Sequence, residues 1–301
     1  MDVVSKVGIL GVPYNVGWKG EGIDKGPQAL RNAGLAERLG KVACIVQDLG
    51  DIQADLPPYD DSNPKLLNPR QVIALCRVLA SRVEKICRDG YFPLILGGED
   101  SVLMGIIEGL KRGLKKRIGL IYFDAHGDFN MPETTPSGLI GGMNVAVVAG
   151  RGPEMLTKMF GYAPQLPEEN IALFGARDLD PPEKIALEDS RVHVYSRAKI
   201  SELGIEAAMN DALGRLQTAC DQVYIHVDLD VLDEDAMKAQ ILPVPDGLSL
   251  SETSSAIRMA RATGKLQGIA IMVFNPLKDP EGLEARKVTE LISEAMSPER
   301  V

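Results

Sequence analysis

The segment 121–130, Ile121-Tyr-Phe-Asp-Ala-His-Gly-Asp-Phe-Asn130, joins an apolar, strand-like run to a group of polar side chains. Asp124, His126 and Asp128 follow one another at intervals of two residues. Because side chains alternate between the two faces of a strand, this spacing places all three on one face of an extended segment. The segment therefore predicts a buried strand that ends in metal-binding side chains.

A second segment, Val223-Tyr-Ile-His-Val-Asp-Leu-Asp230, repeats this pattern with His226, Asp228 and Asp230 on one face. Burying an ionised carboxylate is very costly unless a cation compensates its charge. Two such strands predict a divalent metal cluster at the carboxyl ends of a parallel sheet. The alternative is that these aspartates only begin loops or cap helices, a role that would suit Asp128 best.

Strand-like and helical segments alternate along the whole chain. Apolar, β-branched runs predict strands at 6–12, 42–48, 92–97, 117–124, 170–175, 192–195, 222–228 and 267–274. Helical periodicity predicts helices at 26–38, 70–88, 100–112, 201–218, 250–263 and 283–296. This alternation predicts an α/β fold, in which helices cover both faces of a mostly parallel sheet. With no repeat or linker in the sequence, we expect a single domain over residues 1–301.

The composition indicates the size of the core, the partners that are unfavourable and the state of the cysteines. A chain of 301 residues with 45% hydrophobic content can bury a large core as one domain. The net charge of -9 argues against binding to nucleic acid or to an anionic membrane. No run of 18 apolar residues occurs and the N-terminus leads directly into a predicted strand, so we expect a cytoplasmic protein without a membrane span or signal peptide. The scattered cysteines predict buried free thiols: Cys44, Cys76, Cys87 and Cys220.

Four loops rich in proline and glycine connect these elements, at 13–25, 52–68, 129–143 and 234–248. The last two follow the carboxylate-bearing strands directly. Binding sites of open parallel sheets lie in the loops beyond the carboxyl ends of the strands. These loops therefore predict a site that closes over a small-molecule substrate.

With these motifs in place, the chain resembles the ureohydrolase family of arginases, agmatinases and formimidoylglutamases, and within it most of all the arginases. The resemblance runs almost end to end, and its most specific part is Asp-Ala-His-x-Asp followed by Asp-x-Asp. The motifs occur in the expected order: Gly11-Val-Pro13, Gly20-Glu-Gly-Ile-Asp-Lys-Gly-Pro-Gln-Ala-Leu-Arg31, Gly97-Gly-Glu-Asp-Ser101, Asp124-Ala-His-Gly-Asp128, Gly175-Ala-Arg-Asp-Leu-Asp-Pro-Pro-Glu183, Asp228-Leu-Asp230 and Phe274-Asn-Pro276.

The resemblance implies a three-layer α/β/α sandwich around an eight-stranded, mostly parallel sheet, assembled as a homo-oligomer, a trimer or hexamer. It also implies two manganese ions (Mn2+), which activate water for attack on a guanidinium carbon and release urea. Asp124 and Asp228 would bridge the two ions, Asp128 would complete one, and His126 and Asp230 would complete the other. Asp128 and Asp230 are also the expected catalytic residues. Oxygen ligands with one imidazole suit manganese.

One ligand position departs from the family pattern. Asp100, in Gly97-Gly-Glu-Asp-Ser101, stands where the family has a metal-binding histidine. Aspartate can bind manganese, but its negative charge weakens the ions as Lewis acids. Two ions, one ion and none therefore remain as alternatives. We expect His226 to hydrogen-bond to a carboxylate beneath the metals, and the alternative is that it binds a metal itself.

The pocket for the scissile group departs further. Polar or charged family residues are replaced by Leu139, Gly141, Leu242 and Val273. Val273 takes the place of the glutamate that anchors the guanidinium, and a buried guanidinium without a charge partner is strongly penalised. These changes favour a substrate less cationic than arginine.

The residues for the amino-acid end of the substrate match the family better. Asn130 and Ser137 correspond to positions that bind the α-carboxylate, and Asp180 and Glu183 to positions that bind the α-amino group. Their alternative roles are a turn, a loop and the start of a helix.

Three functions follow. The first is a binuclear manganese hydrolase that cleaves the C–N bond of an amidino group on arginine or a related amino acid. The second is a catalytically inactive relative with a structural or regulatory role. The third is a single-metal hydrolase resembling deacetylases, with Asp124, His126 and Asp228 as its ligands.

Overall fold

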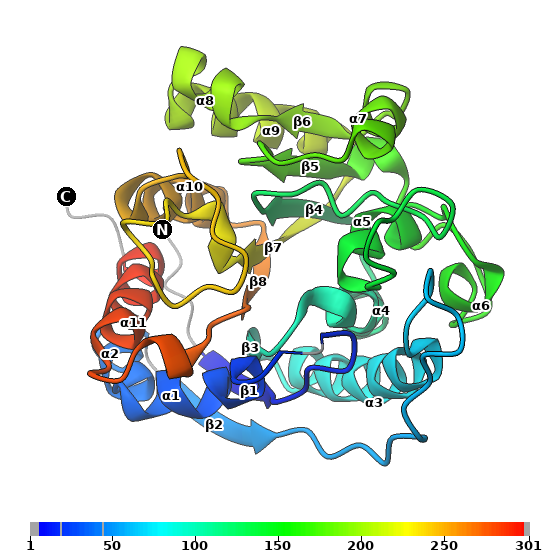
Figure 1. Cartoon of the computed structure of the whole chain (residues 1–301). Coiled ribbons are helices and arrows are strands. Elements are labelled where there is room, and N and C mark those ends of the chain that lie inside the picture. Colours follow the sequence, from blue (N-terminus) through cyan, green and yellow to red (C-terminus); the bar gives the residue numbers. More distant parts are fainter. Residues whose placement is uncertain (1–5, 19, 44, 298–301) are drawn as a thin grey trace.

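The structure is a computed structural model that describes residues 6–18, 20–43 and 45–297 (Figure 1). Eight parallel strands form one sheet in the order β2-β1-β3-β8-β7-β4-β5-β6. This confirms the predicted α/β class and the eight-stranded sheet. The strands are β1 (Lys6–Val12), β2 (Ile45–Asp51), β3 (Phe92–Gly97), β4 (Ile118–Phe123), β5 (Ile171–Phe174), β6 (His193–Tyr195), β7 (Gln222–Asp228) and β8 (Leu266–Met272).

Helices cover both faces of the sheet and complete the three layers. In Figure 1, α1, α2, α10 and α11 lie on one side of the central strands, and α3 to α6 lie on the other. The helices are α1 (Gly26–Asn32), α2 (Leu35–Leu39), α3 (Pro69–Arg88), α4 (Leu103–Leu114), α5 (Asn144–Val148), α6 (Glu154–Thr157), α7 (Pro181–Glu188), α8 (Arg197–Leu203), α9 (Ile205–Ala219), α10 (Leu250–Ala262) and α11 (Leu283–Met296).

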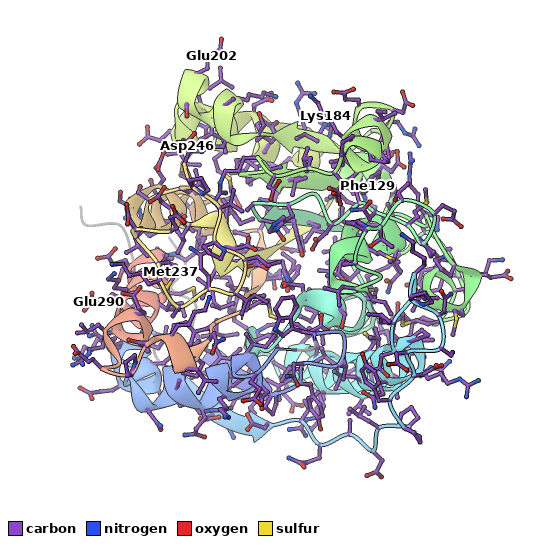
Figure 2. All side chains as sticks on the ribbon, in the orientation of Figure 1. Phe129, Lys184, Glu202, Met237, Asp246 and Glu290 are labelled. Atoms are coloured by element: carbon purple, nitrogen blue, oxygen red, sulfur yellow. The ribbon has the colours of Figure 1, made fainter. Side chains whose placement is uncertain are left out.

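Each strand of the centre contributes to two hydrophobic cores. On β4, Ile121 and Phe123 belong to the core under α9 to α11, whereas Leu120 and Tyr122 belong to the core under α3 to α5. A central strand of this fold must be apolar at nearly every position, because both of its faces are covered. Figure 2 shows the opposite at the periphery, where Glu202 and Glu290 extend from the surface.

Several predicted elements have different bounds in the structure. The predicted helix at 26–38 is two helices separated at Gly34, and the one at 201–218 is divided between α8 and α9 at Gly204. Both glycines have left-handed backbone angles, with φ of 84° and 81°, which side-chain-bearing residues rarely adopt. The predicted strand at 42–48 lies at 45–51. β2 is an edge strand with largely exposed side chains, so hydrophobicity marks its ends poorly.

The cysteines are mostly as predicted. Cys76 and Cys220 are buried free thiols, Cys87 is partly buried, and Cys44 lies outside the described residues. Burial raises the pKa of Cys76 and of Cys87 to about 12. Within the described chain, no helix combines the length and the apolar character needed to cross a membrane.

Candidate metal centre and its cavity

The loops beyond the carboxyl ends of β1, β3, β4, β5, β7 and β8 enclose a cavity of about 330 Å³. The side chains at the carboxyl ends of the central strands therefore lie together at one edge of the sheet, as expected for an open parallel sheet. Of the fifteen predicted site residues, all but His226 line this cavity: Asp100, Asp124, His126, Asp128, Asn130, Ser137, Leu139, Gly141, Asp180, Glu183, Asp228, Asp230, Leu242 and Val273.

Asp124, His126 and Asp230 form the tightest group of metal-binding side chains. One ligand atom from each lies within 4.8 Å of the others. The Nδ1 atom of His126 is 3.1 Å from Asp124 Oδ1 and 3.2 Å from Asp230 Oδ2. The Ala125 backbone N–H donates to Asp230 Oδ1 at 3.1 Å, which fixes this carboxylate against β4. The group therefore has the spacing and the rigidity of a metal site.

The electrostatics of the cluster fit a divalent cation. Burial and the neighbouring carboxylates raise the pKa of Asp128 and of Asp228 well above the usual range, and the pKa of Asp230 to about 7. Burial disfavours the charged form of His126, but hydrogen bonds to Asp124 and Asp230 raise its pKa to about 12. Without metal, these groups must retain protons to lower their mutual repulsion. Divalent cations would supply the missing positive charge, and oxygens with an imidazole suit manganese.

Two further carboxylates face the same region. Asp128 has a left-handed φ of 49°, and its Oδ2 accepts a hydrogen bond of 2.5 Å from the Tyr122 hydroxyl. Asp100 follows β3 in a 3₁₀ turn, Asp100–Val102, and its Oδ1 lies 2.8 Å from Nε2 of the fully buried His226. His226 thus lies behind a carboxylate, which is the geometry expected for a supporting hydrogen bond.

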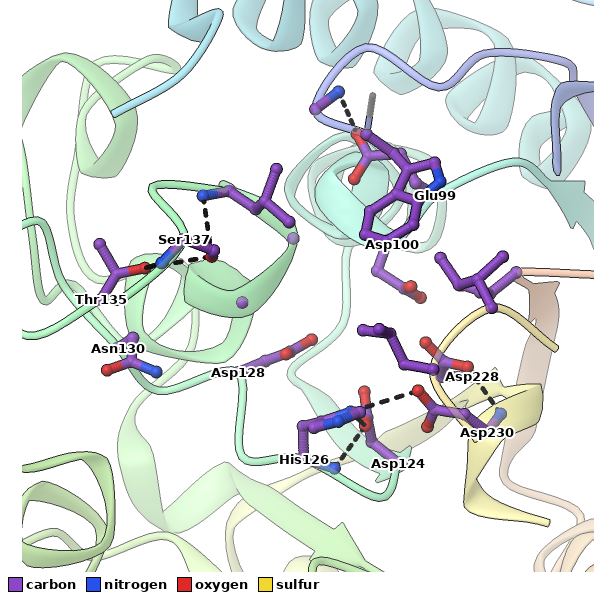
Figure 3. A pocket seen from close by; sticks show the side chains of 18 of the residues that line it. Glu99, Asp100, Asp124, His126, Asp128, Asn130, Thr135, Ser137, Asp228 and Asp230 are labelled. Atoms are coloured by element: carbon purple, nitrogen blue, oxygen red, sulfur yellow. Dashed lines mark hydrogen bonds and ion pairs between the residues drawn. The ribbon is translucent and has the colours of Figure 1, made fainter. Parts of the chain in front are cut away.

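The residues predicted for the amino-acid end lie apart from Asp228 and Asp230. Figure 3 shows Asn130 and Ser137 across the cavity from these carboxylates. Asn130 Nδ2 donates to Asp180 Oδ2 at 2.9 Å, while its buried Oδ1 has no hydrogen-bond partner among the described residues. A buried polar atom without a partner is unusual in a protein and marks a place where a ligand can bind.

Glu183 has a different role in the structure. Its carboxylate accepts hydrogen bonds from Phe129 N at 2.8 Å and from Asp180 N at 3.3 Å. It closes the first turn of α7, for which Asp180 is the N-cap residue. Burial raises the pKa of Glu183 to about 7. The helix-start alternative therefore describes both Asp180 and Glu183 in the structure.

Two of the lining residues, Val273 and Gly141, lie close to the turn at Gly98 and Glu99. Val273 has a φ of 66°, an outlier for a β-branched residue, and its N–H donates to Gly98 O at 2.8 Å. A Cβ atom on Gly141 would lie 3.3 Å from Glu99 Oε2. The Glu99 carboxylate therefore faces the space in which a side chain at position 141 would begin.

Sequence reasoning missed several lining residues. Glu99 is buried and accepts hydrogen bonds from Gly17 N and Ser101 N, both at 3.1 Å, and from the Ser101 hydroxyl. Burial raises the pKa of Glu99 to about 7. Trp18 and Ile241 also line the cavity, but they lie in irregular loops, where no periodic pattern assigns a direction to a side chain.

Comparison with known proteins gives matches over nearly the whole chain. The Arginase family model matches residues 5–297. The arginase of Bacillus subtilis (strain 168) is 35% identical over 286 residues, which cover 95% of this chain and 96% of that protein. The arginase structure from Bacillus caldovelox has a TM-score of 0.91 at 32% identity and covers 99% of this chain and 100% of that one. The Entamoeba histolytica arginase, solved in complex with L-ornithine, has a TM-score of 0.90 at 25% identity, with 99% and 100% covered.

Proposed function

Because the chain belongs to the arginase family, we propose that it is a metal-dependent hydrolase that cleaves a C–N bond of an amidino group. The observation that carries this proposal is the group of Asp124, His126 and Asp230, which lies at the carboxyl ends of β4 and β7 with both carboxylates buried and lines the cavity. A hydrolase of this kind needs a rigid metal site beside a substrate cavity, and the fixed group of ligand side chains next to the cavity supports the proposal.

Two manganese ions would supply the Lewis acidity that makes a water molecule nucleophilic near neutral pH. Asp124 and Asp228 are our candidates for ligands shared by both ions. His126 and Asp230 would complete one ion, and Asp128 with Asp100 would complete the other. Each of these six side chains lines the cavity.

Asp128 is the first candidate for proton transfer. Its Oδ2 is held by the Tyr122 hydroxyl, so its other oxygen can accept a proton from water and pass it to the leaving nitrogen. Asp230, with Oδ1 fixed by the Ala125 N–H, is the second candidate.

The substrate we propose carries an α-amino acid group. Asn130 and Asp180, joined by a 2.9 Å hydrogen bond, and the hydroxyl of Ser137 offer polar contacts on the side of the cavity away from Asp228. The L-ornithine complex of the Entamoeba relative supports an amino acid in such a cavity. Among the other lining residues, the apolar side chains of Leu139, Leu242 and Val273 favour an amidino group that is less cationic than the guanidinium of arginine.

A substrate series tests this function. Arginine has an α-amino acid group and a guanidinium, agmatine has no carboxylate, and formimidoylglutamate keeps the α-carboxylate but carries an amidine on its α-nitrogen in place of a free amino group. We expect product from at least one amino-acid substrate with manganese, no product from agmatine, and loss of turnover in Asp128→Asn. Asp55→Asn, a change of the same chemistry at an exposed loop position, is the control.

The second candidate is a catalytically inactive, ligand-binding relative. The observation that favours it is the wall formed by Gly141 and Val273, which offers no proton-transferring side chain at these two positions. Two bound ions without product from any substrate in the series would support it. The single-metal alternative has less support, because the tight ligand group includes Asp230 rather than Asp228.

We also propose a homo-oligomer, a trimer or hexamer, from the resemblance to the family. The chain has a mass of 32.5 kDa. Sedimentation velocity measures the assembly directly, and a monomer at micromolar concentration would contradict this proposal.

A further inference from the structure

A buried polar layer lies directly behind the cavity carboxylates. Tyr122 precedes Asp124 by two residues on β4, and His226 precedes Asp228 by two residues on β7. Tyr122 and His226 are paired in the register of β4 and β7, and Tyr224 lies two residues before His226 on β7. All three layer residues, Tyr122, His226 and Tyr224, have an exposed fraction of 0%. They therefore share the face that carries the carboxylates but cannot contact a substrate.

Both ring nitrogens of His226 have a hydrogen-bond partner. The Tyr224 hydroxyl lies 2.9 Å from His226 Nδ1, and His226 Nε2 lies 2.8 Å from Asp100 Oδ1. A neutral imidazole with its proton on Nε2 accepts from Tyr224 and donates to Asp100, so both ring nitrogens are satisfied. The Tyr122 ring stacks on this imidazole, with 4.9 Å between ring centroids and 12° between planes. The orientation of the imidazole is thus fixed from two sides.

The layer holds one oxygen of each of two carboxylates. His226 binds Asp100, and the Tyr122 hydroxyl donates to Asp128. Asp100 and Asp128 come from different loops, after β3 and after β4, yet both line the cavity. Asp100 and Asp128 therefore line the cavity together with Asp228, the last residue of β7.

We propose that His226 is a positioning residue that acts through Asp100 to build the second metal position, formed by Asp100, Asp128 and Asp228. The proposal rests on the metal-dependent function proposed above. Its physical reason is the length of the side chain: the short aspartate reaches a metal only in a narrow range of orientations. A hydrogen bond from a buried imidazole selects that orientation, and hydrogen-bond partners behind a metal ligand typically change metal affinity by about 10- to 100-fold.

Manganese binding tests the proposal without reference to turnover. Titration calorimetry on the full chain should give two Mn2+ ions for the natural protein. In His226→Leu, we expect the ion held by Asp124, His126 and Asp230 to remain and the other to bind at least about tenfold more weakly. His226→Gln keeps an N–H donor and should recover part of that loss. His193→Leu, the same substitution at a half-buried histidine of the edge strand β6, should bind both ions normally.

Tyr224→Phe provides a second route if His226→Leu does not fold. It removes only the hydroxyl that orients the imidazole, so it should weaken the same ion by less than His226→Leu does. Pulsed electron paramagnetic resonance on the manganese-loaded natural protein should show directly bound nitrogen from one imidazole, that of His126. Two bound imidazoles would overturn the proposal, and so would unchanged affinity for both ions in His226→Leu or, if that variant does not fold, in Tyr224→Phe. A natural protein that binds no manganese would instead overturn the function on which the proposal rests.

Discussion

The charge of Asp228 affects both the stability of the metal-free protein and the binding of metal. Its carboxyl is buried among Asp230, Asp100 and Asp124, and burial together with these charges raises its pKa well above the usual range. Such a group destabilises the metal-free fold at neutral pH, because its charged form is unfavourable there. With metal bound, the same charge becomes favourable. One substitution should therefore have opposite effects on stability and on metal binding.

We predict that Asp228→Asn raises the melting temperature of the metal-free protein and abolishes its stabilisation by manganese. The amide keeps the shape of the side chain and removes the repulsion. Thermal unfolding with and without manganese measures both effects, and Asp55→Asn is the exposed control. A variant that manganese stabilises as strongly as the natural protein would show that Asp228 is no ligand.

The residues of the cavity differ in how well the sequence predicts them. Asp124, His126, Asp228 and Asp230 could be placed together because β4 and β7 are parallel and end at the same edge of the sheet, although of the four only Asp228 lies within a strand. Tyr122 could have been found from strand alternation, since it lies two residues before Asp124. Glu99 could not, because its carboxylate is placed by hydrogen bonds to a distant loop at Gly17.

At the scale of elements, α7 ties the amino-acid side of the cavity to β4. Glu183 lies in the first turn of α7 and accepts from Phe129 N in the loop that also carries Asp128 and Asn130. The Glu183 carboxylate thus joins the first turn of α7 to the loop that carries Asp128. Without this carboxylate, we expect both segments to be held less firmly.

We predict that Glu183→Ala lowers the free energy of unfolding by about 1 to 3 kcal/mol, since it leaves the buried N–H of Phe129 and the partly buried N–H of Asp180 without this acceptor. Glu183→Gln keeps one carbonyl oxygen and should lose less. Glu188→Ala, at an exposed position of the same helix, should change stability little. Urea unfolding measures all three, and equal losses for Glu183→Ala and Glu188→Ala would contradict this role.

The bounds of an element could be predicted from the sequence where burial on both faces makes nearly every position apolar. The central strands, buried on both faces, stand within a few residues of their predicted positions. β2 was placed three residues early because an exposed edge strand lacks a strong hydrophobic pattern. The two interrupted helices follow from the backbone angles of Gly34 and Gly204, which composition alone does not reveal.

At the scale of the whole molecule, we expect metal binding and folding to stabilise each other. The candidate ligands Asp100, Asp124 and Asp228 lie at or just beyond the ends of three different strands, so the unfolded chain cannot hold them together. A ligand that binds only the folded state stabilises it by about 2.7 kcal/mol at 100 times its dissociation constant.

We therefore predict that the melting temperature rises with manganese concentration and that a chelator reverses the rise. Magnesium, which binds histidine poorly, is the matched control and should have a smaller effect. A melting temperature that is independent of manganese would contradict the coupling between this metal and the fold.

The most direct test of the central claim, that the buried carboxylates form a binuclear metal centre, is the manganese content of the full chain. Elemental analysis after loading with manganese and dialysis counts the ions that remain bound. We expect two ions per chain in the natural protein and fewer than two in Asp228→Asn. A natural protein that retains no manganese, while it remains folded, would contradict the claim.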